Sequence, residues 1–218
     1  MMDELDVEAC PLCLGNETAS RFFAEPLRSY DRCSACGLVF VPRRCHLSPE
    51  AEKRRYDLHR NDPEDGGYRD FLERLIAPLA GHLQPAAEGL DFGSGPRPVM
   101  SILLAARGFR MTNYDPFYAD DAPALERTYD FVTCAETVEH FRHPAESWAM
   151  LFRLVRPGGR LGVMTLLREE PAEFSRWWYR QDETHICFYS RATLEWLARH
   201  YSASVEFHGP SVALFQRC

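Results

Sequence analysis

The stretch from Glu88 to Asp115 constrains the fold of this chain more than any other segment. A short apolar run ends at Asp91, a glycine turn follows, and a helical run leads to a second apolar run that closes on Asp115. Glycines at a strand-to-helix turn let the backbone approach a ligand closely, and the N-terminus of a helix favours anionic groups. An acidic residue about 20 residues further on is placed to bind ribose hydroxyls. The stretch therefore predicts a site for a cofactor that contains a nucleoside.

The rest of the chain continues this alternation of strand-like and helix-like runs. Further strands are expected at residues 129–134, 160–166, 204–209 and 212–217, and further helices at 145–155 and 190–200. This order indicates an α/β fold with a mainly parallel sheet, to which the last two strands add an antiparallel hairpin. Only 14 residues separate Asp115 from Asp130, so the strand expected between them must be very short, near residues 123–127.

The first 45 residues contain two C-x-x-C pairs separated by 19 residues. The four cysteines are Cys10, Cys13, Cys33 and Cys36. Each pair can place two thiolates on one cation, and together they form a closed tetrahedral site that suits structural zinc. A redox-active pair is the rival interpretation, which two pairs at this spacing disfavour, and Cys45 with His46 is an alternative ligand pair. We predict a zinc ribbon over residues 1–45 whose folding depends largely on the metal.

Residues 46–82 are expected to connect the ribbon to the α/β domain through two helices. Ser48 followed by Pro49 is an N-cap with proline at the first helical position. Tyr56 and His59 lie three residues apart and therefore on one face of the first helix. These two side chains either pack at the surface or form a lid over the cofactor, and we retain them as candidate cofactor contacts.

The length, net charge and distribution of apolar residues exclude several classes of function. The chain has 218 residues, a net charge of −7 and no run of 18 apolar residues. We therefore expect no membrane span and no broad surface for a nucleic-acid backbone, which makes nucleic acid an unlikely partner. The acidic N-terminus differs from a signal peptide, so we expect a soluble, cytoplasmic protein.

Several segments together resemble the class I S-adenosylmethionine-dependent methyltransferases. They are LDFGSG with the acid after the next strand, YDFVTCAETVEHFRHP, LVRPGGRL and the closing hairpin. The resemblance covers residues 68–218 and implies a Rossmann-like methyltransferase domain at 83–218 with S-adenosylmethionine as its cofactor. The front end is similar to the zinc-binding ribbons attached to some bacterial methyltransferases. A dehydrogenase is the competitor for the glycine turn alone, but the third glycine of its fingerprint is absent.

The resemblance implies a set of cofactor contacts. They are Asp91, Gly93, Ser94 and Gly95 at the turn, Asp115 and Pro116 at the ribose, and Cys134, Ala135 and Glu136 beneath the sulfonium. Arg97 stands where many methyltransferases have glycine, which predicts a displaced start of the following helix. The acid that usually contacts adenine has no evident counterpart, so we expect an adenine pocket that is open or completed by the connecting helices.

Methyl transfer is an in-line displacement at a sulfonium carbon, for which the enzyme aligns the acceptor and, for some acceptors, removes a proton. Four side chains are expected at the carboxyl ends of two strands, and they are Glu136, Glu139, His140 and His185. The E-x-x-E-H pattern with a later histidine is similar to the metal site of small-RNA 2′-O-methyltransferases, and its first part resembles ubiquinone-pathway O-methyltransferases. These side chains can hold a divalent ion that lowers the pKa of an acceptor hydroxyl.

Two other roles for these residues stay open. His140 or His185 can accept a proton directly, or the side chains can be purely structural. We retain His140, His185 and Glu139 as candidate catalytic residues. The bulky residues 177–180 can wall a pocket for a planar or sugar acceptor, or pack beneath their loop.

These features predict an S-adenosylmethionine-dependent enzyme that methylates a small molecule, with oxygen as the expected acceptor atom. The alternative is a catalytically silent cofactor-binding scaffold whose zinc ribbon recruits a protein partner. The intact glycine turn favours real cofactor binding, whereas the shortened third-strand region favours the scaffold.

Overall fold

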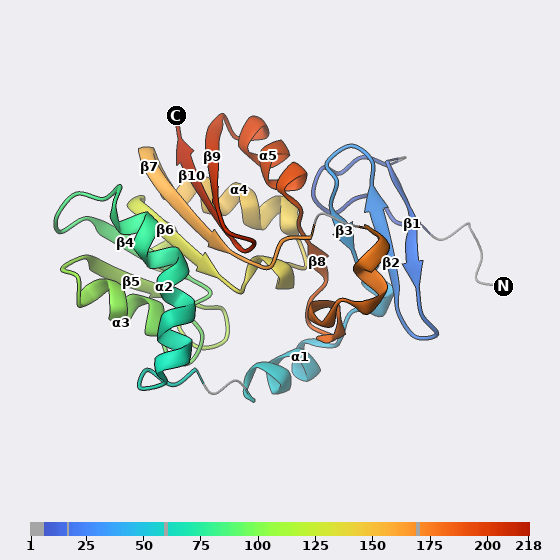
Figure 1. The fold of residues 1–218 in the computed structure, drawn as a ribbon, viewed down its shortest axis with the longest axis horizontal. Coiled ribbons are helices and arrows are strands. Elements are labelled where there is room, and N and C mark those ends of the chain that lie inside the picture. The colour runs from blue at the N-terminus through green and yellow to red at the C-terminus, as the bar shows by residue number, and fades with distance from the viewer. Residues whose placement is uncertain (1–6, 17, 59–60, 169–170) are drawn as a thin grey trace.

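A computed structural model describes residues 7–16, 18–58, 61–168 and 171–218 of the chain. It contains a six-stranded sheet with helices on both faces and a second, four-stranded sheet formed largely by the N-terminal segment (Figure 1). His59, a candidate cofactor contact, lies outside the described residues. Every helix in the described part of the chain is too short or too polar to cross a lipid bilayer.

The central sheet has the strand order β5-β4-β6-β7-β10-β9. Its strands are β4 (Glu88–Phe92), β5 (Arg110–Tyr114), β6 (Tyr129–Ala135), β7 (Val155–Met164), β9 (Ala203–His208) and β10 (Val212–Arg217). The first four strands in this order pair in parallel, and β10 pairs antiparallel with both β7 and β9. The predicted α/β fold with an antiparallel C-terminal hairpin is therefore confirmed.

Four helices cover the two faces of this sheet (Figure 1). They are α2 (Gly66–Ala80), α3 (Val99–Ala105), α4 (Pro144–Leu154) and α5 (Arg191–His200). Successive residues of a strand point to opposite faces, so Phe131 of β6 packs in the core beneath α2 and α3, whereas Val132 packs in the core beneath α4 and α5. The core on the α4 and α5 side continues into the N-terminal sheet.

The segment between β5 and β6 differs from the sequence-based expectation. Residues 116–128 contain a 3-10 turn, η2 (Ala122–Leu125), and an isolated bridge between Asp115 and Ala119, but no strand. Pro123 lies in the first turn of η2 and has no N–H group to donate to a neighbouring strand. The short strand expected at 123–127 is therefore wrong, and β5 forms an edge of the sheet.

The N-terminal sheet joins three ribbon strands to one strand from near the other end of the chain. Its antiparallel order is β1 (Ala19–Ala24), β2 (Ser29–Cys33), β3 (Val39–Phe40) and β8 (Cys187–Phe188). The ring of Tyr30 in β2 packs against Phe174 and Phe188, at centroid distances of 5.0 and 5.8 Å. The ribbon is therefore attached to the α/β part of the molecule through both backbone pairing and aromatic packing.

The helix α1 (Pro49–Tyr56) begins where Ser48 and Pro49 predict, and the Ser48 hydroxyl accepts a hydrogen bond from the Ala51 N–H at 3.3 Å. By contrast, α3 begins only at Val99 and has no side-chain cap. This late start agrees with the displacement predicted from Arg97.

Candidate cofactor and catalytic site

A cavity of 590 Å³ opens at the carboxyl ends of β4, β5 and β6, the edge at which parallel sheets bind ligands. The predicted site residues that line it are Tyr56, Asp91, Gly93, Ser94, Gly95, Asp115, Pro116, Ala135, Glu136, His140 and His185. Glu139 and Cys134 are fully buried and do not line the cavity. The expectation that Cys134 contributes to its floor is not met, because Cys134 and Ala135 point to opposite faces of β6.

The glycine turn forms one wall of the cavity with its backbone. Gly93 and Gly95 have φ values of +80° and +66°, which glycine adopts without the strain that a side chain would add. A Cβ on Gly93 would lie 2.4 Å from the side chain of Thr137. The Gly95 N–H donates to Asp115 Oδ2 at 2.9 Å and ties the turn to the end of β5.

The two predicted aspartates lie in different electrostatic settings. Asp91 is almost fully buried, and its Oδ1 accepts a hydrogen bond from the Thr133 hydroxyl at 2.9 Å. Burial raises the pKa of Asp91 to about 7. Asp115, in contrast, accepts backbone hydrogen bonds from Gly95 and also from Phe117 at 2.9 Å, so its carboxylate is held in place at the cavity wall.

Two histidines face each other across one end of the cavity, with ring centroids 4.9 Å apart. His140 Nδ1 lies 3.0 Å from the Thr184 carbonyl oxygen, and His185 Nδ1 lies 2.7 Å from the Tyr179 carbonyl oxygen. A carbonyl oxygen only accepts hydrogen bonds, so both rings carry a proton on Nδ1, and the neutral form of each ring has its lone pair on Nε2. Burial lowers the pKa of His185 to about 4, which keeps this ring neutral at physiological pH.

A buried acidic group lies beside the histidines. Glu139 is fully buried, and its Oε1 accepts a hydrogen bond from the Tyr179 hydroxyl at 2.5 Å. Its other oxygen, Oε2, has no hydrogen-bond partner among the described residues. Burial, reinforced by the nearby Glu139, raises the pKa of Glu136 to about 9. A buried carboxylate oxygen without a partner is costly in an apolar interior, so this atom suits a proton donor or a cation.

Three of the four predicted metal ligands come together here. The ligand atoms of Glu139, His140 and His185 all lie within 4.8 Å of one another. Glu136 is not a member of this group, although it lines the same cavity. Metal-bound histidines commonly donate their other ring N–H to a backbone carbonyl, as both rings do in this site.

The four predicted zinc ligands form a second cluster of metal-binding side chains. The Sγ atoms of the cysteines lie within 4.8 Å of one another, with Cys10 and Cys36 at 3.6 Å and Cys13 and Cys33 at 3.4 Å, and none forms a disulfide. Zn–S bonds of about 2.3 Å place tetrahedral sulfurs about 3.8 Å apart, so the spacing suits zinc. His46 is not part of the cluster, because its Nε2 is hydrogen-bonded to the Val41 carbonyl at 2.9 Å.

The helix α1 covers the cavity through contacts that the sequence does not reveal. Glu52 accepts a hydrogen bond from Tyr56 Oη at 2.7 Å and forms an ion pair with Arg142 at 2.6 Å. The Tyr56 ring then lies edge-on to His140, with centroids 5.2 Å apart. Glu52 lies in no motif of the chain, and Arg142 lies within the segment YDFVTCAETVEHFRHP without a role assigned to it. The helical spacing of Glu52 and Tyr56 is the one sequence signal for the proximity of those two side chains.

The bulky residues 177–180 divide between the two roles considered for them. Trp178 lines the cavity and is 66% exposed, whereas Trp177 and Arg180 are buried away from it. Tyr179 is buried as well but lines the cavity, and its hydroxyl donates to the buried Glu139.

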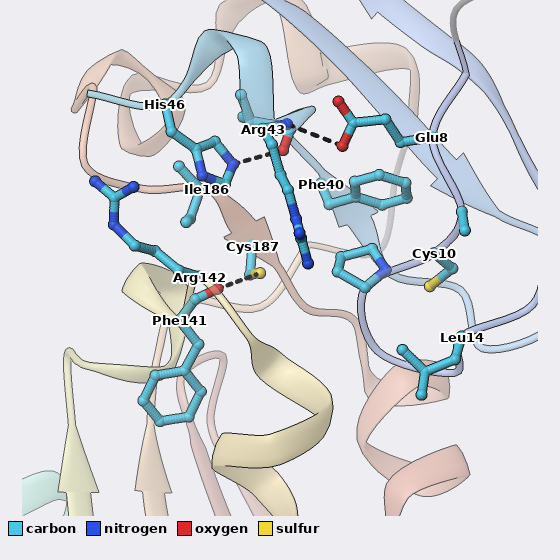
Figure 2. Close-up of a pocket in the computed structure, with 13 residues that line it drawn as sticks. Glu8, Cys10, Leu14, Phe40, Arg43, His46, Phe141, Arg142, Ile186 and Cys187 are labelled. Carbon is cyan, nitrogen blue, oxygen red and sulfur yellow. Dashed lines mark hydrogen bonds between the residues drawn. The ribbon is translucent and has the colours of Figure 1, made fainter. Parts of the chain in front are cut away.

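A smaller cavity of 290 Å³ lies where the ribbon meets the α/β domain (Figure 2). Its walls include Phe40 from the ribbon and Phe141 and Ile186 from the domain. The Cys187 thiol donates to the Phe141 carbonyl at 3.4 Å along one side. Of the predicted site residues, only Cys10 borders this cavity, which marks the largely apolar boundary between the two sheets.

A family model described as a methyltransferase domain matches residues 64–205. The chain belongs to the class I S-adenosylmethionine-dependent methyltransferases. The match spans the glycine turn, both cavity histidines and Glu139, so most of the cavity lining comes from the matched methyltransferase domain, whereas Glu52 and Tyr56 of α1 precede it. The sequence-based identification of the family and of the enzyme class is therefore confirmed.

Individual curated relatives match a smaller part of the chain than the family model does. The ubiquinone biosynthesis O-methyltransferase of Sodalis glossinidius (strain morsitans) is 34% identical over 84 residues, which make up 38% of this chain and 34% of that protein. The match thus spans about a third of the length of this curated relative.

Solved structures share the fold of this methyltransferase. An O-methyltransferase family protein from Burkholderia thailandensis has a TM-score of 0.50 at 15% identity, over 76% of this chain and 62% of that chain. A structure of the Haloferax volcanii Trm112 methyltransferase activator in complex with a methyltransferase has a TM-score of 0.53 at 14% identity, over 74% of this chain and 96% of the matched chain.

Proposed function

We propose that this methyltransferase transfers a methyl group from S-adenosylmethionine to an oxygen atom of a small molecule bound beside His140 and His185. The observation that carries the proposal is the pair of imidazoles, each with its Nδ1 hydrogen-bonded to a backbone carbonyl, in the same cavity as the glycine turn. Similarity to a ubiquinone biosynthesis O-methyltransferase over part of the chain supports oxygen as the acceptor atom.

In this proposal the cofactor occupies the end of the cavity near the glycine turn. Its methionine part lies against Asp91 and the backbone of Gly93, Ser94 and Gly95, and Asp115 and Pro116 lie at its ribose. Ala135 and Glu136 lie beneath the sulfonium, whose methyl group is the electrophile. A charged Glu136 would attract the sulfonium in the ground state, but its raised pKa leaves the side chain protonated and neutral at physiological pH.

His140 accepts the proton of the acceptor hydroxyl at Nε2. The Thr184 carbonyl holds the opposite nitrogen as N–H, and this hydrogen bond also stabilises the imidazolium that forms. His185 has a pKa of about 4, which makes it a weaker base, so we assign it to orienting the acceptor oxygen. Glu139 and the edge of Tyr56 complete the surroundings of the two rings.

A divalent cation is a second means of activating the same hydroxyl. Glu139, His140 and His185 supply one carboxylate and two imidazole ligand atoms within 4.8 Å of one another, and Glu139 Oε2 has no hydrogen-bond partner among the described residues. A cation held there lowers the pKa of an acceptor hydroxyl. Glu136 lies outside this three-residue set and is not assigned as a ligand.

We also propose that Cys10, Cys13, Cys33 and Cys36 hold a structural zinc ion. Four thiolates leave no open position for a substrate, so the ion contributes folding energy to the ribbon rather than chemistry. The domain boundaries at 45 and 82, the cytoplasmic location and a protein partner at the ribbon stay predictions.

The test measures S-adenosylhomocysteine release with a panel of phenols, sugars and aliphatic alcohols, in enzyme stripped of labile metal and then resupplied with Mg²⁺, Mn²⁺ or Zn²⁺. Turnover of a hydroxyl acceptor that falls at least about 100-fold in His140→Ala supports the proposal. Cofactor binding with no turnover of any acceptor favours the silent scaffold instead. Full turnover in both His140→Ala and His185→Ala removes the histidines from the mechanism.

A further inference from the structure

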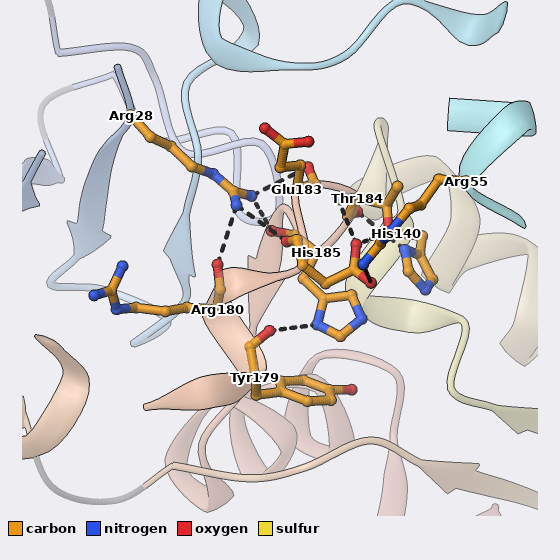
Figure 3. A network of polar contacts seen from close by, with 9 residues as sticks. Arg28, Arg55, His140, Tyr179, Arg180, Glu183, Thr184 and His185 are labelled. Atoms are coloured by element: carbon orange, nitrogen blue, oxygen red, sulfur yellow. Dashed lines mark hydrogen bonds and ion pairs between the residues drawn. The ribbon is translucent and has the colours of Figure 1, made fainter. Parts of the chain in front are cut away.

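Arg28 extends from the ribbon to the loop that carries His185 (Figure 3). It lies between β1 and β2, and its guanidinium donates hydrogen bonds to four backbone carbonyl oxygens of that loop. The Nη1 atom donates to Arg180 at 3.1 Å and to Asp182 at 3.0 Å. The Nη2 atom donates to Glu183 at 3.3 Å and to His185.

Two other carbonyls of the same loop accept hydrogen bonds from the cavity histidines. The Tyr179 carbonyl accepts from His185 Nδ1, and the Thr184 carbonyl accepts from His140 Nδ1. The loop over residues 179–185 therefore presents one set of carbonyls to the ribbon and another set to the two imidazoles. A guanidinium that fixes the first set also fixes the direction of the second, because both belong to the same short backbone.

Only arginine can make this set of contacts. Its planar fork offers several N–H donors at fixed angles, whereas a lysine ammonium is a single point with three donors. The guanidinium carbon also lies 5.3 Å from the centre of the Tyr30 ring, which restricts its position over an aromatic face.

We propose that Arg28 is a positioning residue: through the backbone of residues 179–185, it holds His140 and His185 as Nδ1–H tautomers with their Nε2 atoms directed at the acceptor. The proposal rests on the function proposed above only for the role of the histidines in methyl transfer. It assigns the ribbon a part in the reaction although its cysteines lie outside the lining of the larger cavity.

The ribbon has a second attachment that does not involve Arg28. The Val41 N–H donates to the Ile186 carbonyl at 2.9 Å, and the Ile186 N–H donates to the Glu139 carbonyl at 2.8 Å. Together with the pairing of β3 and β8, this backbone link keeps the ribbon docked when the Arg28 side chain is shortened. Substitution of Arg28 therefore tests the position of the loop rather than the attachment of the ribbon.

The experiment compares Arg28→Lys with Arg32→Lys in the full-length protein labelled with ¹⁵N at histidine. Arg32 is an exposed arginine on the neighbouring strand β2, and it contacts Phe22 rather than the loop, so its substitution controls for the loss of a ribbon guanidinium. Zinc content and S-adenosylhomocysteine affinity report on folding. The ¹⁵N shifts of the imidazoles report their tautomers, and kcat and KM are measured separately.

We expect Arg28→Lys to keep its zinc and to bind S-adenosylhomocysteine within about twofold of wild type, while kcat falls about 10- to 100-fold, as small misplacements of catalytic groups do. The Nδ1–H signals of one or both cavity histidines should give way to a mixture of tautomers. Unchanged tautomers together with a kcat equal to that of Arg32→Lys would overturn the proposal.

Two further outcomes separate this proposal from the proposed function. If Arg28→Lys loses zinc or cofactor binding, the histidine tautomers are measured in the ligand-free wild-type enzyme instead. An Nε2–H tautomer at either cavity histidine overturns the proposal, and Nδ1–H at both supports it. If the tautomers change in Arg28→Lys but not in Arg32→Lys, while wild type turns over no hydroxyl acceptor, the proposed function fails and the positioning by Arg28 stands.

Discussion

The ribbon and the central sheet are ordered by different means. The ribbon has three short strands and places four cysteine sulfurs within 4.8 Å of one another. The sheet instead buries large apolar side chains on both faces, among them Leu75, Phe131 and Trp148. The ribbon should therefore depend on one bound ion, whereas the sheet distributes its stability over many contacts. Because the cavity histidines depend on both parts, the site can fail in two independent ways.

The largest effect should come from removing the zinc site, which separates the two parts. In Cys10→Ser with Cys36→Ser, we expect loss of zinc, unfolding of the ribbon and loss of turnover by at least about 100-fold, because structural zinc sites contribute about 10 kcal/mol or more. Elemental analysis and limited proteolysis measure the first two effects. The control is Cys45→Ser, outside the cluster, and a double variant that kept its zinc would contradict the prediction.

The next effect belongs to the sheet alone and depends on pH. The folded-state pKa of Asp91 is about 7, above its ordinary value of 3.8, so the native protein retains a proton that the unfolded chain releases. The stability that this proton provides is complete below about pH 4 and is lost as the pH rises through 7, a change of about 4 kcal/mol. Urea unfolding of ligand-free protein from pH 4 to 9 should show this decline, and Asp91→Asn should remove the Asp91 share of the slope between pH 4 and 7.

Glu136 supplies the matched comparison for Asp91. Its pKa is raised from 4.5 to about 9, so its contribution to stability declines between about pH 4.5 and 9. Glu136→Gln should therefore remove the decline above pH 7 and part of the decline between pH 4.5 and 7, and leave the Asp91 part in place. An identical curve for wild type and both variants would show that neither carboxyl group is protonated in the folded protein.

A smaller effect is expected at the glycine turn, where the sheet meets the cofactor. Gly93→Ala adds a Cβ that would lie 2.4 Å from the Thr137 side chain, at a backbone φ of +80°. Backbone strain and overpacking together should destabilise the fold by about 3 kcal/mol. We also expect S-adenosylhomocysteine to bind at least about tenfold more weakly. Gly108→Ala is the control, because Gly108 has a φ of +89° and open space around it. Calorimetry on both variants separates backbone strain from the collision, and equal binding losses would contradict the assignment.

The smallest effect should appear at α1, which links the two parts over the cavity. Glu52→Gln weakens the ion pair with Arg142 and the hold on Tyr56, and we expect about a threefold rise in KM with little change in kcat, an energy of about 0.7 kcal/mol. Lys53→Gln breaks an exposed ion pair with Asp57 on the same helix, which should contribute almost nothing. Steady-state kinetics that do not distinguish the two variants would remove the lid role from Tyr56.

Local signals account for what the sequence predicted correctly. Ser48 with Pro49 starts α1 through contacts within one turn, and the glycine turn precedes α3, which begins at Val99. The fold class, the family and the approach of the four cysteines all followed from patterns of this kind.

The features that the sequence did not predict depend mainly on contacts between distant parts of the chain. The two residues of β8 have no periodicity of their own and become a strand only because β3 lies beside them. Arg28 resembles any other ribbon arginine in the sequence, since its partners lie more than 150 residues away. The short strand expected at 123–127 does not form, because this segment contains Pro123 and folds into a 3-10 turn instead.

The pairing of β3 with β8 also bears on how this enzyme can be divided for study. A polypeptide beginning after the ribbon would leave Cys187 and Phe188 with an unsatisfied backbone edge and would uncover the aromatic side chain of Phe174. Bare strand edges beside apolar surface attract other chains. Such a truncated enzyme should self-associate, so low solubility after excision of residues 1–45 would report a lost neighbour rather than a damaged catalytic domain.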